Sequence, residues 1–240
     1  MQSVAAEGIE FIERCAIATA AASVDDFNAT IKRIGFDVAA CGAWIGVGAN
    51  RRSRFFFVTW PRDWLEFYEK NQFFQHDPAV AEARRRLSSF WFSEIVSNLK
   101  LAGKQKELHE AVLAYGYNDV FIIPIHGPGS VQGVVTLATR RALALGPADR
   151  TGVEMMSRAV WERCRTAEGS GVSEPARVQL TPRELECLRW VAAGKSDSDI
   201  ASLVGIKPAT AHFHIEQAKK RFGVKTRVEA VAVGVLHGMI

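Results

Sequence analysis

The chain has 240 residues, with 30 Lys and Arg against 26 Asp and Glu and a formal net charge of +4. This length is sufficient for two domains. No apolar stretch approaches the ~20 residues that a membrane-spanning helix requires, and the acidic N-terminus does not resemble a signal peptide. We therefore expect a cytoplasmic protein without a membrane partner.

The excess positive charge is confined to the C-terminal part of the chain. Residues 176–240 contain ten basic and six acidic residues, which accounts for the whole excess and leaves residues 1–175 formally neutral. A neutral module joined to a basic one suits a protein whose basic end meets phosphates. The net charge alone is weak evidence, because many proteins reach it without binding nucleic acid.

The four cysteines are scattered along the chain and form no CxxC pair: Cys15, Cys41, Cys164 and Cys187. Such spacing favours buried thiols in a reducing compartment over disulfides or metal ligands. The sequence accordingly predicts neither a metal site nor a cofactor.

Residues 1–166 alternate between helical and strand-like patterns. Helices are expected at residues 9–22, from a cap at Ser23 or Asp25 to residue 34, and at residues 61–71, 78–87, 99–115 and 147–165. Strands are expected at residues 39–47, 54–59, 89–94, 120–126 and 131–139, the last two forming a hairpin around the sequence GPGS at residues 127–130. Five strands with helices before, between and after them predict an α/β/α sandwich on a five-stranded antiparallel sheet, within an α+β protein.

A change of composition marks a domain boundary. Residues 168–175, EGSGVSEP, are rich in Gly, Ser and Pro and lack apolar periodicity, which is typical of a flexible linker. We therefore divide the chain into a first domain at residues 1–166, a linker at residues 167–176 and a second domain at residues 177–240.

Residues 177–240 predict an all-α domain of four helices. Three of the helices begin with a capping box, in which Ser or Thr is followed three positions later by an acidic residue. These pairs are Thr181 with Glu184, Ser196 with Asp199, and Thr226 with Glu229. Gly194 ends the first helix, Gly205 makes the turn after the second, and Pro208 opens the third. The second and third of these helices are predicted to form a helix-turn-helix. The helix that begins at Pro208 would enter a DNA major groove.

This segment resembles the LuxR-type helix-turn-helix. The matching positions of the family signature are Glu184, Leu188, Gly194, Ile200, Ala201, Thr210 and His214. Two positions depart from the family pattern. Lys207 stands where Ser usually precedes the recognition helix, which removes the usual cap, and Ala211 stands where Val is common. We expect these departures to leave the fold intact and to alter the base preference.

The resemblance implies that the helix starting at Pro208 reads DNA. The side chains expected to face the groove are Lys207, Thr210, His212 and Glu216. The side chains expected to contact phosphates are Lys219, Lys220 and Arg221. A charged helix end of this kind is also typical of a helix face that is simply exposed to solvent, and this is the alternative to phosphate contact. His214 is expected to be structural, because the family shares it irrespective of the target sequence.

A second group of residues lies in the first domain. Trp64 and Tyr68 are four residues apart and share one helix face, Trp60 precedes them by one turn, and Asp77 follows. Indole N–H and phenol O–H groups on apolar rings can orient a small polar head group in an apolar pocket, and a buried carboxylate accepts an amide N–H. Without further information, Asp77 before Pro78 is more often a helix cap, and aromatic residues at this spacing are more often core residues than ligand contacts.

The spacing Trp-x3-Trp-x3-Tyr-x8-Asp-Pro resembles the acyl-homoserine lactone pocket of LuxR-type quorum-sensing receptors. The resemblance implies that the Trp64 indole donates to the lactone carbonyl and that Asp77 accepts the amide N–H of the ligand. Trp60 stands where the family usually has a Tyr that donates to the acyl carbonyl. An indole can also donate there, but its greater bulk would shorten the pocket.

Further departures affect the walls of this pocket. Members carry Phe-x-Trp on the next strand, whereas this chain has Phe90, Trp91 and Phe92 in succession. We include Trp91 and Phe92 in the site, although a shift by one residue turns a side chain to the other face of a strand. Val120 replaces a frequent Gly, and Thr136 stands where the family places Thr or Ser near the acyl chain. These residues favour a short, branched or aromatic acyl group.

The resemblance as a whole implies a quorum-sensing transcription regulator. A buried acyl chain would stabilise the first domain, by about 2.7 kcal/mol when the lactone is at a hundred times its dissociation constant. A homodimer would then bind half-sites of double-stranded promoter DNA about one helical turn apart. The last helix, at residues 226–236, has an apolar face for pairing two such units, for packing within its own domain, or for both. RNA polymerase is a further candidate partner.

Three alternatives are weighed against this interpretation. An orphan regulator of the same architecture, responding to another small molecule or to none, stays open because of the pocket departures. A phosphorylation-driven response regulator would need an acidic cluster and a strand-end Asp in repeating βα units, which residues 1–166 lack. An enzyme is disfavoured because His76, His109 and His126 lack metal-ligand spacing and no GxSxG, HExxH or phosphate loop occurs.

Overall fold

The computed structural model describes residues 3–45, 52–97, 99–127, 132–167, 179–236 and 238–240. The chain divides into two compact units, the first with the described residues up to 167 and the second with those from 179 onward, and each unit is described by itself. All but the first residue of the predicted linker, and most of the predicted GPGS turn, lie outside the described residues. In the described part of the chain, no helix is long and apolar enough to cross a membrane.

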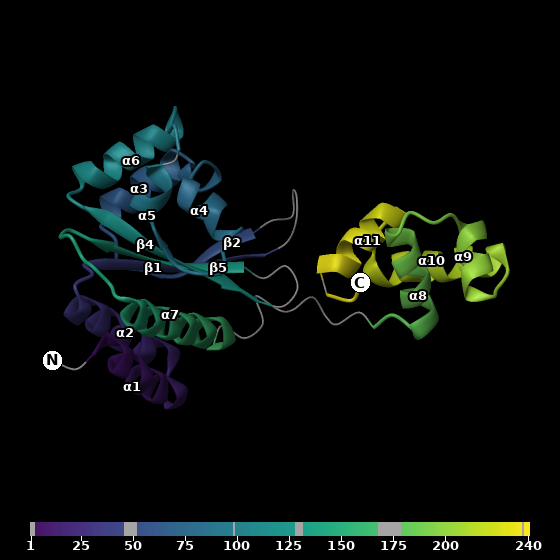
Figure 1. Ribbon diagram of the computed structural model, residues 1–240, viewed down its shortest axis with the longest axis horizontal. Coiled ribbons are helices and arrows are strands. Elements are labelled where there is room, and N and C mark those ends of the chain that lie inside the picture. The colour runs from purple at the N-terminus through teal and green to yellow at the C-terminus, as the bar shows by residue number, and fades with distance from the viewer. Residues whose placement is uncertain (1–2, 46–51, 98, 128–131, 168–178, 237) are drawn as a thin grey trace. The chain divides into compact units, whose positions relative to one another are not determined.

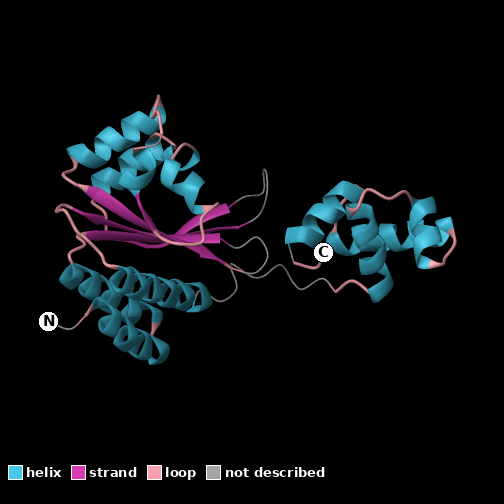
Figure 2. Cartoon of the chain, in the orientation of Figure 1, coloured by secondary structure: helices cyan, strands magenta, loops and turns pink. Residues whose placement is uncertain are grey.

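The first unit is an antiparallel sheet with helices on both faces (Figures 1 and 2). Within the described residues the sheet has five strands in the order β2-β1-β5-β4-β3: β1 (Val38–Ile45), β2 (Arg52–Val58), β3 (Phe90–Trp91), β4 (Asp119–His126) and β5 (Gln132–Thr139). One face is covered by α1 (Val4–Ile17), α2 (Ala20–Ile34) and α7 (Pro147–Ala167). The other face carries α3 (Arg62–Lys70), the 3-10 helix η2 (Phe73–Gln75), α4 (Pro78–Ala83), α5 (Phe92–Val96) and α6 (Lys104–Ala114). The predicted α/β/α sandwich is confirmed.

The first two helices meet at a different place from the one predicted. α1 ends at Ile17. The hydroxyl of Thr19 accepts the N–H of Ala22 at 3.2 Å and so caps α2. Ser23 and Asp25, the predicted caps, lie inside this helix because the chain turns one helical turn earlier than the apolar periodicity indicates.

The strand predicted at residues 89–94 is shorter than expected. Its paired part is Phe90–Trp91, and α5 follows directly. The carboxylate of Asp119 at the start of β4 accepts the N–H of Ser93 at 3.1 Å, which holds the first turn of α5. A long-range polar contact therefore converts the end of this predicted strand into a helix.

Two close approaches fix α7 in the first unit. Gly152 lies where α7 crosses α1, and a Cβ there would be 2.7 Å from the carbonyl oxygen of Val4. Further along α7, the indole N–H of Trp161 donates to the carbonyl oxygen of Gly42 at 3.1 Å. The same ring covers Gly133, where a Cβ would lie 2.2 Å from Nε1. The small residues at these positions let the helix lie directly on α1 and on the sheet.

The second unit consists, over its described residues, of four helices as predicted: α8 (Pro182–Ala192), α9 (Asp197–Val204), α10 (Pro208–Phe222) and α11 (Arg227–Leu236). All three predicted capping boxes are present. Gly194 and Gly205 have φ angles of 77° and 72°, the left-handed backbone that glycine adopts without strain at a helix end. Lys207 provides no side-chain cap to α10, as expected from its replacement of Ser.

The core of the second unit is formed by buried small and aliphatic side chains of the helices, including Cys187, Leu188, Ile200, Ala211 and Ile215. All four cysteines of the chain are buried thiols, as predicted. Burial of Cys41 in apolar surroundings raises the pKa of its thiol well above the ordinary value.

We predict that Gly152→Ala destabilises the first unit. The added methyl would meet backbone atoms of α1, and overpacking of this kind costs about 1–3 kcal/mol, which exceeds the ~0.5–1 kcal/mol that Ala gains over Gly within a helix. Thermal unfolding followed by circular dichroism should show a lower melting temperature. Gly146→Ala is the control, because a Cβ there would make an ordinary contact of 3.7 Å with Asp149. Equal melting temperatures for the two variants would contradict the close helix crossing.

Candidate ligand pocket and DNA-binding helix

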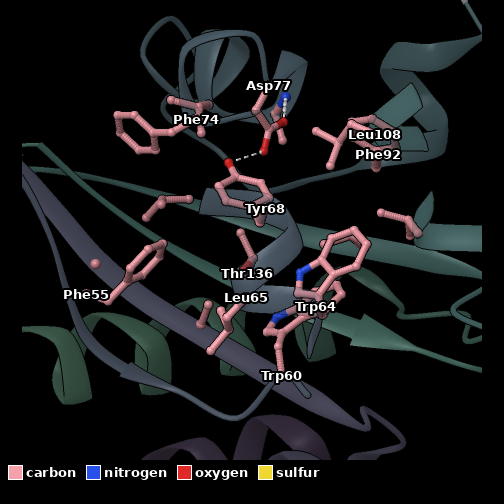
Figure 3. Close-up of a pocket in the computed structure, with 17 residues that line it drawn as sticks. Phe55, Trp60, Trp64, Leu65, Tyr68, Phe74, Asp77, Phe92, Leu108 and Thr136 are labelled. Carbon is pink, nitrogen blue, oxygen red and sulfur yellow. Dashed lines mark hydrogen bonds between the residues drawn. The ribbon is translucent and has the colours of Figure 1, made fainter. Parts of the chain in front are cut away.

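A cavity of about 100 Å³ lies between the sheet and the helices on the α3–α6 side (Figure 3). Its floor is formed by two cross-strand pairs, Ala40 with Thr136 and Gly42 with Val134. The β1 members of these pairs have little or no side chain, so space is left above the sheet. Aliphatic and aromatic residues from the covering helices complete the walls: Leu65, Phe74, Leu108 and Val112.

Asp77 supplies the one charged side chain among the described residues that line this cavity. Its carboxylate accepts the N–H of Ala79 at 2.8 Å, which caps α4, and the hydroxyl of Tyr68 at 3.0 Å. Burial raises the pKa of Asp77, while these hydrogen bonds oppose the shift. Burial and the adjacent carboxylate also raise the pKa of Tyr68, so this hydroxyl stays protonated and donates.

The Asp77 carboxylate has acceptor capacity to spare. A carboxylate offers about four lone-pair sites, and here backbone N–H groups and one phenol hydroxyl occupy part of them. No Lys, Arg or His pairs with Asp77 within the described part of the chain. A ligand that brings an N–H donor into the cavity would therefore meet a buried, strongly accepting oxygen.

Trp60 and Trp64 form one side of the cavity in Figure 3, with Tyr68 and Asp77 above them. The two indoles stack with ring centroids 5.0 Å apart and planes at 24°. The centroid of the Tyr117 ring lies 4.7 Å from that of Trp60. Neither indole N–H has an acceptor in the part of the chain that the structure describes, so both donors are available to a ligand.

The cavity reaches the surface beside β2. Phe55 lines it and is nevertheless 43% exposed, whereas Trp60 and Trp64 are 8% and 5% exposed. The two indoles therefore lie in the less exposed part of the lining, whereas Tyr68 and Asp77 are half-buried.

The second unit presents α10 after the turn at Gly205. Lys207 and Lys220 are exposed, and Thr210 is half-buried. Two of the side chains expected to face a groove have partners in their own unit: the His212 ring lies 2.9 Å from the carboxylate of Asp197, and Glu216 accepts from Lys219 at 2.6 Å. Two of the four side chains predicted to face the groove are therefore already engaged in pairs on this surface.

Two family descriptions match the chain. Residues 19–163 match the autoinducer binding domain, and residues 178–233 match the bacterial regulatory proteins of the luxR family. The chain belongs to the LuxR family of transcription regulators. Because this family consists of regulators with an autoinducer-binding domain, the enzyme alternative is excluded.

Named relatives agree with this assignment. The transcriptional activator protein BjaR1 of Bradyrhizobium diazoefficiens is 28% identical over 184 residues, which cover 75% of this chain and 74% of that protein. The quorum sensing-dependent transcriptional regulator RpaR of Rhodopseudomonas palustris is 25% identical over 232 residues, covering 97% and 94%. The crystal structure of Escherichia coli SdiA has the same fold, with a TM-score of 0.71 at 16% identity over 97% of this chain and 95% of that one.

The structure brings most of the predicted pocket residues of this LuxR-family chain together. Trp60, Trp64, Tyr68 and Asp77 line the cavity with Phe92, Val120 and Thr136. Trp91 does not line it and was wrongly included. Its ring packs 4.8 Å from Phe121 and 6.0 Å from Phe36 in the core on the opposite face of the sheet. Strand alternation is the reason, since neighbouring side chains point to opposite faces.

The three side chains predicted to contact phosphates have different partners in the structure. The Arg221 guanidinium lies 2.9 Å from the carboxylate of Glu184, which is 5% exposed and also caps α8. Lys219 is engaged by Glu216, with a side chain only 17% exposed. Arg221 therefore ties the end of α10 to the start of α8. Of the three predicted cations, Lys220 has no ion-pair partner among the described residues.

Several lining residues were missed by the sequence analysis. Ala40 and Gly42 alternate along β1 and Val134 alternates with Thr136 along β5, so period-two spacing could have identified them once the face was known. Phe213 was also missed, although it is 55% exposed on α10. An apolar residue on a helix has the same local pattern whether it is buried or exposed, so the sequence alone does not single it out.

We predict that Tyr68→Phe destabilises the unliganded first unit by about 1.5–3 kcal/mol, the range for hydrogen bonds to charged groups. The variant leaves the buried Asp77 carboxylate with one donor fewer. Chemical denaturation monitored by tryptophan fluorescence measures the change.

Tyr115→Phe is the matched control for this variant, because the Tyr115 hydroxyl donates to Asp63 at 3.1 Å but at an exposed position. We expect little change there, since solvent screens exposed polar pairs. A loss of stability in Tyr115→Phe equal to that in Tyr68→Phe would show that burial of Asp77 is not the cause.

Proposed function

We propose that the first unit binds an N-acyl homoserine lactone in its cavity. The observation that carries this proposal is the buried Asp77 carboxylate, which has spare acceptor capacity and no cationic partner among the described residues. The amide N–H of the ligand would donate to it. The free indole N–H of Trp64 would donate to the lactone carbonyl, and that of Trp60 to the acyl carbonyl.

We further propose that the acyl group is short, branched or aromatic. Trp60 packs against the rings of Trp64 and Tyr117 and fills space that a smaller aromatic side chain would leave open. Val120 adds a side chain to the wall, and Phe92 and Thr136 bound the remaining space. An aromatic acyl group would also gain offset ring contacts with these walls.

Binding would stabilise the first unit. An apolar cavity of this size costs on the order of 2 kcal/mol when it is left unfilled, and the ligand would replace the lost contacts. Mass action adds about 2.7 kcal/mol at a hundred times the dissociation constant. This is a large share of the ~5–15 kcal/mol by which domains are stable, so the lactone would control how much folded protein is present.

We propose that the second unit binds promoter DNA as half of a homodimer in the cytoplasm. Two half-sites about one helical turn apart require two copies of α10. α11 supports such pairing, because Val228 and Val235 are 73% and 55% exposed and seven residues apart on one face. Ala230 and Gly234 of the same helix are buried within their own unit, so both predicted roles of this helix are compatible. Contact with RNA polymerase is a separate prediction.

An orphan regulator of the same architecture is the second candidate. Trp60 favours it, because this bulky residue narrows the cavity where the resemblance leads us to expect Tyr. Such a protein would keep the DNA-binding unit and respond to a different small molecule or to none.

We predict that one class of lactone raises the melting temperature of the purified full chain. The panel consists of butanoyl, 2-methylpropanoyl, benzoyl and dodecanoyl homoserine lactones, measured by differential scanning fluorimetry. A member at a hundred times its dissociation constant should raise the melting temperature by about 5–10 °C, and we expect the dodecanoyl compound to give the smallest shift.

Asp77→Ala should lose this shift, whereas Asp63→Asn, which changes an exposed carboxylate outside the cavity, should retain it. If the wild-type chain shows no shift with any of the four lactones, the lactone proposal fails and the orphan regulator takes its place. A shift that survives in Asp77→Ala would instead exclude the proposed role of this carboxylate.

A further inference from the structure

The outward face of α10 has an apolar centre. Ala211, Ile215 and Ala218 are buried against the other helices, which places Phe213 on the opposite side. The Phe213 ring is 55% exposed, and its one ring contact in the described residues is with its neighbour His214, 5.7 Å away. Exposure of so large an apolar side chain leaves it available for a partner on this face.

Gln217 follows Phe213 by four residues and therefore lies on the same face, one turn further along. Its side-chain amide has no hydrogen-bond partner among the described residues and can donate and accept at once. The neighbouring polar side chains differ in this respect, since His212 is paired with Asp197 and Glu216 with Lys219. Phe213 and the half-buried Gln217 are thus neighbouring side chains of the recognition helix that no hydrogen bond or ion pair engages within the described residues.

Charge on this face is placed at the two ends of the helix. Lys207 precedes α10 and Lys220 lies in its last turn, and both are exposed. A helix of 15 residues is about 22 Å long, whereas the major groove is about 12 Å wide. The two cations can therefore reach the phosphates that border the groove while Phe213 and Gln217 lie over the base edges.

On the basis of the proposed DNA-binding function, we infer that Phe213 and Gln217 read A·T base pairs in each half-site. Phe213 contacts the 5-methyl group of a thymine, the one apolar group that a base presents in the major groove. Gln217 makes paired hydrogen bonds to N6 and N7 of a neighbouring adenine, the geometry that suits a side-chain amide. The specificity of this chain then comes from these two residues in addition to those expected from the family signature.

The test begins with the DNA sites that the protein itself selects. Full-length wild-type protein, alone and with each of the four lactones named above, selects duplexes from a random library. In the selected site each thymine is then replaced in turn by uracil, which lacks only the methyl group. We expect one uracil position per half-site to lower the affinity about fivefold, near the lower end of the range for one specific base contact.

Variants assign the effect to residues. Phe213→Ala should bind the thymine and uracil forms of the site equally, and Gln217→Ala should lose at least a fivefold preference for adenine at the adjacent pair. Leu203→Ala is the matched control, because Leu203 is 52% exposed on α9 of the same unit. It should retain both preferences. Each preference is a ratio of affinities for two DNA molecules, so a partly inactive preparation does not change it.

The outcomes separate this inference from the function on which it rests. A wild-type chain that selects no sequence under any condition would overturn the proposed DNA-binding function together with the inference. A wild-type chain that selects a site, with binding that ignores uracil and is unchanged in Phe213→Ala and Gln217→Ala, would overturn the inference alone.

Discussion

A carboxylate held away from water without a cation is unstable unless hydrogen bonds stabilise its charge. In the first unit, Asp77 is in this situation, with the Ala79 N–H and the Tyr68 hydroxyl as donors and burial raising its pKa. The same residue begins α4 and lines the cavity, so helix position and pocket chemistry depend on one side chain. The two interpretations of Asp77 from the sequence, helix cap and ligand acceptor, are therefore not exclusive. The cap is present in the structure, and the remaining acceptor capacity is what the lactone proposal uses.

Local signals predicted the second unit more completely than the first. Capping boxes such as Thr181 with Glu184 act within four residues, so the chain around them is enough to specify where a helix begins. The tie from Arg221 to Glu184 joins residues 37 positions apart and was not foreseen. Arg221 was assigned to phosphates because a basic residue at a helix end has the same local pattern whether it is solvated, bound to DNA or paired inside the unit.

In the first unit, strand alternation and long-range strand pairing determine which residues line the cavity, and these could not be predicted from local sequence. The sequence shows that Trp is shifted by one residue within the Phe-Trp-Phe segment. Whether the Trp91 side chain then faces the cavity depends on which face of β3 lies toward it. Pairing of Phe90 with Ile122 and of Trp91 with Phe121 settles this, and Trp91 joins the core beneath α7. The cavity floor depends similarly on the register between β1 and β5, which places Gly42 opposite Val134. A cavity is the space left by residues distant in sequence, so no local pattern predicts its volume.

The central claim is that the Asp77 carboxylate accepts an N–H of the ligand. Isothermal titration calorimetry can compare the stabilising homoserine lactone with its ester analogue, in which an oxygen replaces the amide N–H. A hydrogen bond to a buried charged group contributes about 1.5–3 kcal/mol, so the wild-type protein should bind the amide roughly 10–150 times more tightly, and Asp77→Ala should lose this preference. Equal affinities of the wild-type protein for the amide and the ester would contradict the account.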